Sequence, residues 1–147
     1  MFGAVPSILK HFTLNIIHIR SVYGVFHNPN RRIFYVKLNN NDRAVLLYKK
    51  DNNTLDMRSI NVPTEYQGRG LARILAEAAL TYAIVHDYRI ILTCKYMQNF
   101  YLATKNRELE ERVIGPSNLL SPSAKSLHPD TIDDLPDPQD PVNSPNK

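Results

Sequence analysis

A glycine-bracketed basic turn between two segments of different periodicity constrains the fold of this chain most. Residues 55–62 have the pattern of a strand, the turn Gln67-Gly68-Arg69-Gly70 follows, and an amphipathic segment begins at Leu71. The first N–H groups of a helix have no intrahelical partner, and the helix dipole adds partial positive charge there. Glycines beside such a terminus let an anion approach the backbone closely. The segment therefore predicts a phosphate-binding turn between a strand and a helix.

The turn lacks the features of two common nucleotide-binding loops. No Gly-Lys-Ser/Thr follows it, as a P-loop requires, and the third glycine of the Rossmann pattern is missing. The five histidines are scattered, and a single cysteine gives no ligand set at zinc spacing. We therefore expect a phosphate-binding turn without a metal site.

The remaining patterns predict an α+β fold. Apolar residues alternate over 32–38 and 55–62, and the apolar run 44–48 is a further expected strand; turn clusters between these segments are typical of an antiparallel meander of hairpins. A helical stripe runs from Leu71 to about His86, and the apolar run 89–94 indicates a strand buried on both faces. A βαβ crossover makes residues 89–94 parallel to 55–62. The other expected elements are a short strand over 22–26 and a helical stretch over 96–112 that breaks near Asn106.

The two ends of the chain differ in composition from its middle. Residues 1–26 are expected to form an extension, and its start over 1–22 is apolar and free of acids, which fits either a mitochondrial presequence or a plain tail. Residues 27–112 are the expected folded domain. Residues 113–147 are rich in Pro, Ser and Asp, and we expect a disordered tail there because few apolar side chains offset chain ordering.

Composition also limits the partners. The 147 residues contain no apolar run of 18, so no membrane insertion is expected. One cysteine excludes an internal disulfide and suits a reducing compartment, which favours an intracellular protein, cytoplasmic or mitochondrial. The formal net charge is only +4, and Arg31-Arg32 and Arg73 have the pattern of solvated positions. No nucleic-acid surface is therefore predicted.

Cys94 and Tyr96 are the candidate catalytic residues. Cys94 ends the expected buried strand, where it is either a small core residue or a thiol nucleophile at the carboxyl end of a parallel strand. Tyr96 lies at helical spacing with Phe100 and Tyr101, which is typical of a core, yet a phenol can also protonate a leaving thiolate. Both interpretations stay open for each residue.

Three segments taken together resemble the minimal GNAT acetyltransferase family, whose animal members are called N-acetyltransferase domain-containing (NATD-type) proteins. The segments are 42–48, 62–70 and 92–96, and the turn carries the family's Q-x-x-G-x-A pattern. The resemblance covers roughly residues 27–112. It implies two splayed parallel strands with the co-substrate acetyl-CoA between them, its pyrophosphate on the turn and its pantetheine along the first strand. The implied cofactor-binding residues are Ile60, Asn61, Val62, Gln67, Gly68, Arg69, Gly70, Leu71 and Ala72.

The resemblance implies a transferase, specifically an acyltransferase that moves an acetyl group from acetyl-CoA to an amine acceptor. By the same resemblance, Cys94 is the catalytic thiol and Tyr96 lies beside it. Ser59 stands where many members carry histidine, and Phe100 lacks a hydroxyl that many members have. A non-catalytic CoA-binding interaction module is therefore the alternative, whereas the buried strand argues against a basic helix–turn–helix over 71–104.

Overall fold

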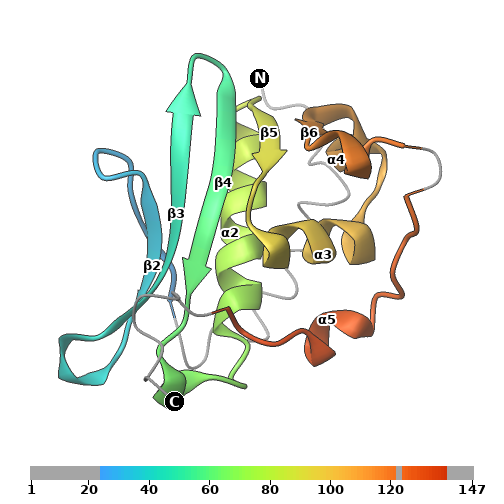
Figure 1. Ribbon diagram of the computed structural model, residues 1–147. Coiled ribbons are helices and arrows are strands. Elements are labelled where there is room, and N and C mark those ends of the chain that lie inside the picture. The colour runs from blue at the N-terminus through green and yellow to red at the C-terminus, as the bar shows by residue number, and fades with distance from the viewer. Residues whose placement is uncertain (1–23, 122–123, 139–147) are drawn as a thin grey trace.

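A six-stranded mixed sheet organises the residues that the computed structural model describes, which are 24–121 and 124–138 (Figure 1). The strands lie side by side in sequence order. The possible presequence over 1–22 lies outside the described residues. The strands are β1 (Phe26–Asn28), β2 (Ile33–Lys37), β3 (Arg43–Asp51), β4 (Thr54–Asn61), β5 (Arg89–Leu92) and β6 (Val113–Gly115). The α-helices are α2 (Leu71–Val85), α3 (Lys95–Thr104), α4 (Arg107–Arg112) and α5 (Thr131–Asp134), and the 3-10 turns are η1 (Asn39–Asn41), η2 (Thr64–Tyr66) and η3 (Ser117–Leu119).

The strand pairing confirms the predicted α+β class. β1 to β4 pair antiparallel as successive hairpins, and β4, β5 and β6 pair parallel. The helix α2 forms the crossover between β4 and β5. The predicted strand over 22–26 lies later, at Phe26–Asn28, where it pairs with β2. The predicted break near Asn106 is real, because the Asn106 side chain accepts a hydrogen bond from the Leu109 N–H at 3.2 Å and caps α4.

The helix α2 lies behind β4 in Figure 1 and buries a wider face than the predicted stripe. Leu71 and Leu75 are fully buried as expected, but Val85 is 56% exposed, and Leu80 is buried instead. The reason is that α2 contacts β2, β3 and β4 and also α3 and α4, so two of its flanks are covered. Alanines at 72, 76, 79 and 83 permit this close packing.

The parallel strands β4 and β5 part halfway along β4. Their pairing ends at Met57 and Leu92, although β4 continues to Asn61. Immediately after β5, the N–H groups of Thr93 and Cys94 both donate to the Met57 carbonyl oxygen, at 3.1 and 2.9 Å. The chain then turns into α3, so β5 ends two residues before the predicted limit of 94. This splayed arrangement agrees with the one that the family resemblance implies.

Residues 113–121 and 124–138 contain secondary structure, unlike the disordered tail expected over 113–147, whereas residues 122–123 and 139–147 lie outside the described residues. The strand β6 extends the sheet beside β5, and α5 contacts α3. Three apolar side chains, Val113, Leu119 and Ile132, are between 3% and 7% exposed within the main core. The average composition of the segment is polar, but a few well-spaced apolar anchors are enough to dock it on a core that already exists.

Candidate functional site

The turn before α2 presents open backbone. Gly68 and Gly70 have φ of +79° and +76°, a left-handed conformation that costs an L side chain roughly 1–2 kcal/mol. A Cβ built on either glycine meets no atom within 4 Å, so the space beside the turn is free of described atoms. Gly70 is also the N-cap of α2 and has no side chain to accept from the first helical N–H groups. The turn therefore has open space on the side where a Cβ would lie.

The turn holds an anion from the chain itself. The Gly68 N–H donates to the Asp137 Oδ2 at 2.8 Å, and the Gln67 Nε2 donates to the Asp137 carbonyl oxygen at 3.3 Å. Nearby, the Val62 N–H donates to the carbonyl oxygen of Pro138 at 2.9 Å. A backbone N–H that binds a carboxylate makes a charge-assisted hydrogen bond, as it does with a phosphate oxygen. The donor set at this turn thus fits the group that the sequence predicts there.

A cavity of about 360 Å³ lies between the turn and residues 131–138, which we call the C-terminal segment. Tyr96, on the first turn of α3, contributes to its wall although its side chain is only 6% exposed. The structure therefore brings one of the two predicted catalytic residues together with the predicted anion-binding turn. The lining residues are Gln67, Gly68, Gly70, Arg73, Tyr96, Ile132, Asp133, Leu135, Pro136 and Asp137.

Tyr96 carries its proton at neutral pH. Burial raises the pKa of Tyr96 strongly, and the negative charges of Asp137, Glu77 and Asp133 raise it further, while the positive charge of Arg73 lowers it. The phenol is therefore available as a proton donor rather than as a preformed phenolate.

Arg73 and Glu77 form an ion pair beside the cavity. This pair was not predicted from the sequence. The Arg73 Nε lies 3.2 Å from the Glu77 Oε1, and its Nη1 lies 2.6 Å from the Asp133 Oδ1. Glu77 is fully buried, and its Oε2 has no hydrogen-bond partner within the described residues. Burial raises the pKa of Glu77, against the hydrogen bond and charge of Arg73, which lower it. The sequence could have predicted this ion pair, because the two residues are spaced i,i+4 on the helix α2, among its alanines.

Cys94 lies where β4 and β5 part. It is the N-cap of α3, its N–H is bonded to Met57, and its side chain is 7% exposed. It is not among the residues that line the cavity. Phe100 is fully buried and stacks on Tyr96 with ring centroids 6.4 Å apart. The structure thus places Cys94 close in sequence to the cavity wall, with its thiol packed in the core.

The other predicted cofactor-binding residues divide into two groups. The side chains of Ile60, Val62, Leu71 and Ala72 are at most 3% exposed and belong to the core, so only their backbone groups can face a ligand. Asn61 is half-buried, and the Arg69 guanidinium lies over the Tyr66 ring, 5.0 Å from its centroid. This cation–π contact fixes the Arg69 guanidinium over Tyr66 beside the turn.

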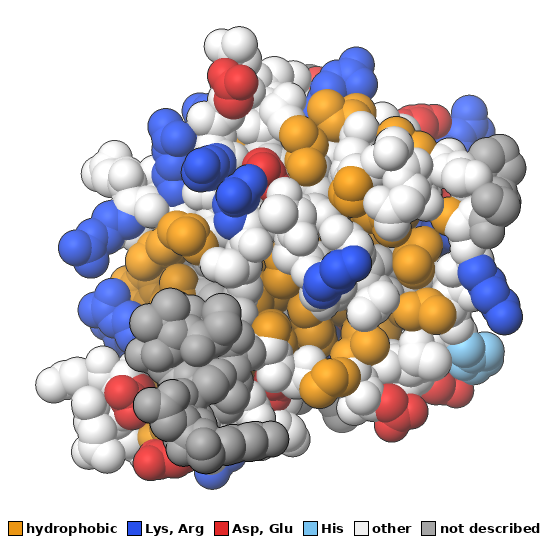
Figure 2. Space-filling model, viewed as in Figure 1, with side chains coloured by type: hydrophobic (Ala, Val, Ile, Leu, Met, Phe, Trp, Pro, Cys, Tyr) orange, Lys and Arg blue, Asp and Glu red, His pale blue; other side chains and the backbone are white. Residues whose placement is uncertain are grey.

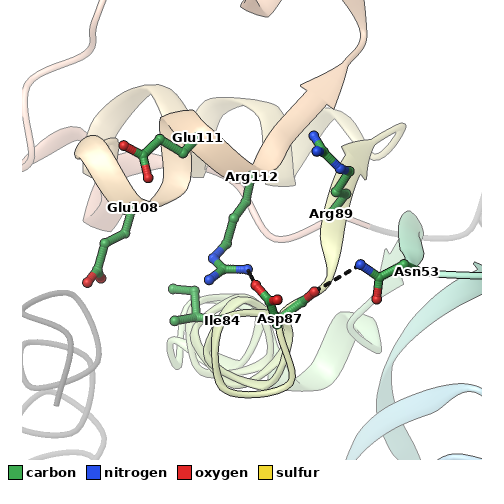
Figure 3. A pocket seen from close by; sticks show the side chains of 7 residues that line it. All are labelled: Asn53, Ile84, Asp87, Arg89, Glu108, Glu111 and Arg112. Carbon is green, nitrogen blue, oxygen red and sulfur yellow. Dashed lines mark hydrogen bonds and ion pairs between the residues drawn. The ribbon is translucent and has the colours of Figure 1, made fainter. Parts of the chain in front are cut away.

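A second hollow lies at the opposite end of α2 and has mixed charge (Figure 3). There the Arg112 Nη1 is 2.7 Å from the Asp87 Oδ1, and the Asn53 Nδ2 donates to the Asp87 carbonyl oxygen at 3.2 Å. Three acidic side chains (Asp87, Glu108 and Glu111) and two basic ones (Arg89 and Arg112) line it, so it offers no single ligand charge. Across the described ranges 24–121 and 124–138, no cluster of three His, Cys, Asp or Glu suits a metal ion. None of the described helices combines the length and apolar composition needed to span a bilayer.

Comparison with known proteins shows the protein family to which this fold and this turn belong. The sequence pattern of the GCN5-related N-acetyl-transferase family matches residues 33–112, and the chain belongs to this GNAT family. Its relatives are the NATD-type proteins, as predicted. It is similar to Protein NATD1 of Danio rerio, with 35% identity over 103 residues that cover 69% of this chain and 94% of that protein.

Two further relatives carry the same name. The chain is 38% identical over 94 residues to Protein NATD1 of Xenopus tropicalis, covering 63% of this chain and 86% of that protein. It is 44% identical over 78 residues to Protein NATD1 of Homo sapiens, covering 52% and 69%. No solved structure shows significant similarity to the chain. The family match ends at Arg112 and so leaves out β6 and the C-terminal segment.

Proposed function

We propose that residues 27–112 form an N-acetyltransferase that binds acetyl-CoA on the turn 67–72 and transfers the acetyl group to an amine. Membership of the GNAT family supports the class of reaction. The observation that carries the proposal is the carboxylate on the Gly68 N–H, in the cavity that Tyr96 lines. An anion-binding backbone and a protonated phenol are the two groups that this reaction needs from the protein.

The geometry of the turn and of β4 suits the two polar parts of CoA. The Gly68 N–H and the open N-terminus of α2 suit the pyrophosphate, because these donors bind a charged oxygen without a metal. The Val62 N–H, which now donates to a carbonyl oxygen, suits an amide of the pantetheine arm in the gap beside β4. The backbone around Ile60–Val62 is the candidate donor set for the thioester oxygen.

In the proposed reaction, the acceptor nitrogen attacks the thioester carbonyl carbon, so a C–N bond forms and the C–S bond breaks. The Tyr96 hydroxyl gives its proton to the departing sulfur, and the resulting phenolate takes the proton that the new amide nitrogen loses. The raised pKa of Tyr96 keeps the phenol protonated before the reaction and makes the phenolate a strong base, which supports the second proton transfer.

A covalent route through acetyl-Cys94 is the alternative within the same class. Its support is the position of Cys94 at the N-terminus of α3, where the strands part. The packed thiol and its place outside the cavity lining favour direct transfer. Direct transfer with Tyr96 as the proton donor is therefore the mechanism that we propose.

Ligand-dependent thermal unfolding of the full chain tests the proposal. Acetyl-CoA and CoA should raise the unfolding temperature, since ligand at about 100 times its Kd adds roughly 2.7 kcal/mol of stability. ATP and NAD should leave it unchanged. Gly70→Val should abolish the rise, because the new side chain enters the open space beside the turn and strains a φ of +76°.

Gly24→Val is the matched control, because Gly24 is exposed and a Cβ there also meets nothing within 4 Å. It should retain the full rise with CoA. Undiminished CoA binding by Gly70→Val would remove the turn from the site. Normal CoA binding without transfer to any amine would favour the non-catalytic CoA-binding module.

A further inference from the structure

The C-terminal segment (residues 131–138) lies on the candidate CoA site. Its contacts reach both polar positions of that site: Asp137 accepts from Gly68 on the turn, and Pro138 accepts from Val62 at the end of β4. Gln67 adds a third hydrogen bond to the Asp137 carbonyl oxygen. Backbone and side chain of the segment therefore occupy the donors that a CoA molecule would need.

Apolar packing and an ion pair also anchor the C-terminal segment to the rest of the fold. Ile132 is 7% exposed within the main core, and α5 packs against α3. The Arg73 Nη1 holds the Asp133 Oδ1 at 2.6 Å. Upstream, the Leu127 N–H donates to the Leu102 carbonyl oxygen at 3.0 Å, which fixes the path of the chain along α3. These contacts all involve residues that precede Asp137 and Pro138 in the chain. They therefore position Asp137 and Pro138 at the candidate CoA site.

The chemistry of the segment matches the chemistry of the group it replaces. The Asp137 carboxylate gives the Gly68 N–H an anionic acceptor, as a phosphate oxygen would, and the Pro138 carbonyl gives the Val62 N–H a neutral amide acceptor, as pantetheine would. On the face shown in Figure 2, hydrophobic side chains gather over α3 and α5, and acidic side chains lie at the edge beside α5. The segment thus combines an apolar anchor with an acidic tip.

We propose that residues 131–138 are a built-in competitor of acetyl-CoA, which rests on the proposed function of the same site. The carboxylate of Asp137 and a pyrophosphate cannot accept from the Gly68 N–H at once. The docked and the CoA-bound forms therefore exclude each other, and the apparent Kd for CoA equals the intrinsic Kd divided by the fraction of molecules in which the segment is released. Release of the segment activates the site.

The test compares two variants of the full chain, Asp137→Ala and Asp134→Ala, by calorimetric titration with CoA. Both remove one negative charge from neighbouring positions. Asp137 bonds to the turn, whereas Asp134 is exposed and is not part of the cavity lining. Loss of one charge-assisted hydrogen bond on a half-buried segment should lower the apparent Kd for CoA about 3- to 10-fold in Asp137→Ala. Asp134→Ala should bind CoA with the wild-type Kd.

The backbone amide signal of Gly68 in a 15N–1H correlation spectrum gives a readout without CoA. Asp137→Ala should shift this signal and that of Val62, and Asp134→Ala should leave both in place. Equal CoA affinity in the wild type, Asp137→Ala and Asp134→Ala would contradict the proposed competition, while CoA binding itself would still support the proposed function. Failure of all three to bind CoA would overturn the proposed function and the competition with it.

Discussion

At the scale of single residues, the proposed acetyl transfer depends on whether Tyr96 or Cys94 acts on the thioester. Tyr96 lines the cavity beside the anion-binding turn, while Cys94 is packed at the N-terminus of α3. Sequence reasoning could single out both, because each follows a buried apolar run at the edge where parallel strands end. It could not choose between them, since the choice depends on which side chain faces the cavity.

Tyr96→Phe should lower kcat for acetyl transfer about 10²-fold, as expected for a lost general acid. CoA affinity should be unchanged, because the hydroxyl does not bind the phosphate. Steady-state kinetics with calorimetric CoA binding measure both. Since burial raises the pKa of Tyr96 above its usual 10.0, the phenol should keep its proton between about pH 7 and 9, and its ionisation should cause no fall in kcat there.

The control for this prediction is Cys94→Ala, which should keep its transfer activity and lose on the order of 1 kcal/mol of stability from a small cavity. An acetyl group on Cys94 after incubation with acetyl-CoA, detected by mass spectrometry, together with loss of turnover in Cys94→Ala, would establish the covalent route instead.

Glu77 gives a pH-dependent prediction. Burial raises its pKa above the usual 4.5, so the folded chain keeps the proton at pH values where the unfolded chain has lost it. Wild-type stability should therefore fall as the pH rises from about 4.5 through the folded-state pKa, relative to Glu77→Gln, which cannot ionise. Urea unfolding at several pH values measures the difference.

Below the unfolded-state pKa the difference between Glu77→Gln and wild type should become independent of pH, because the carboxyl is then protonated in both states. A wild-type advantage that grows as the pH rises toward neutrality would show instead that Arg73 outweighs burial and stabilises the charged form.

At the scale of elements, β6 shows how a strand can escape sequence analysis. It has only three residues, Val113–Gly115, and a proline follows directly, so no alternating run of useful length exists. The strand forms because β5 offers a parallel partner and because the core has room for the Val113 side chain. Tertiary contacts thus create an element that its local sequence does not specify.

Val113→Ala and Ile114→Ala form a matched pair that tests this explanation. Val113 is 3% exposed and should lose about 1–2 kcal/mol of unfolding free energy when shortened, because its methyl groups fill the core. Ile114 is 40% exposed, and its loss should stay within about 0.5 kcal/mol. Chemical denaturation of the two variants measures both values, and equal losses would place β6 outside the core.

At the scale of the whole molecule, the order and direction of β2 to β5 and the position of α2 follow from hydrophobic periodicity and turn residues. The turn at Gly68 and Gly70 follows as well, because few other arrangements join a strand to a helix through two glycines. The docking of residues 131–138 could not be predicted. It depends on three hydrogen bonds and a few apolar anchors spread over distant positions, none of which makes a local pattern.

The hydrogen bond from Val62 to Pro138 has a kinetic consequence. Val62 lies beyond the end of β4, and its amide proton is held by the C-terminal segment. Exchange of this proton with deuterated solvent should then require the segment to leave, whereas exchange at Leu46, in the centre of β3, should require the sheet to open. The ratio of the two exchange rates in the resting protein reports how often the C-terminal segment leaves the site. Acetyl-CoA should change the exchange rate at Val62, whereas the exchange rate at Leu46 should stay nearly constant or decrease.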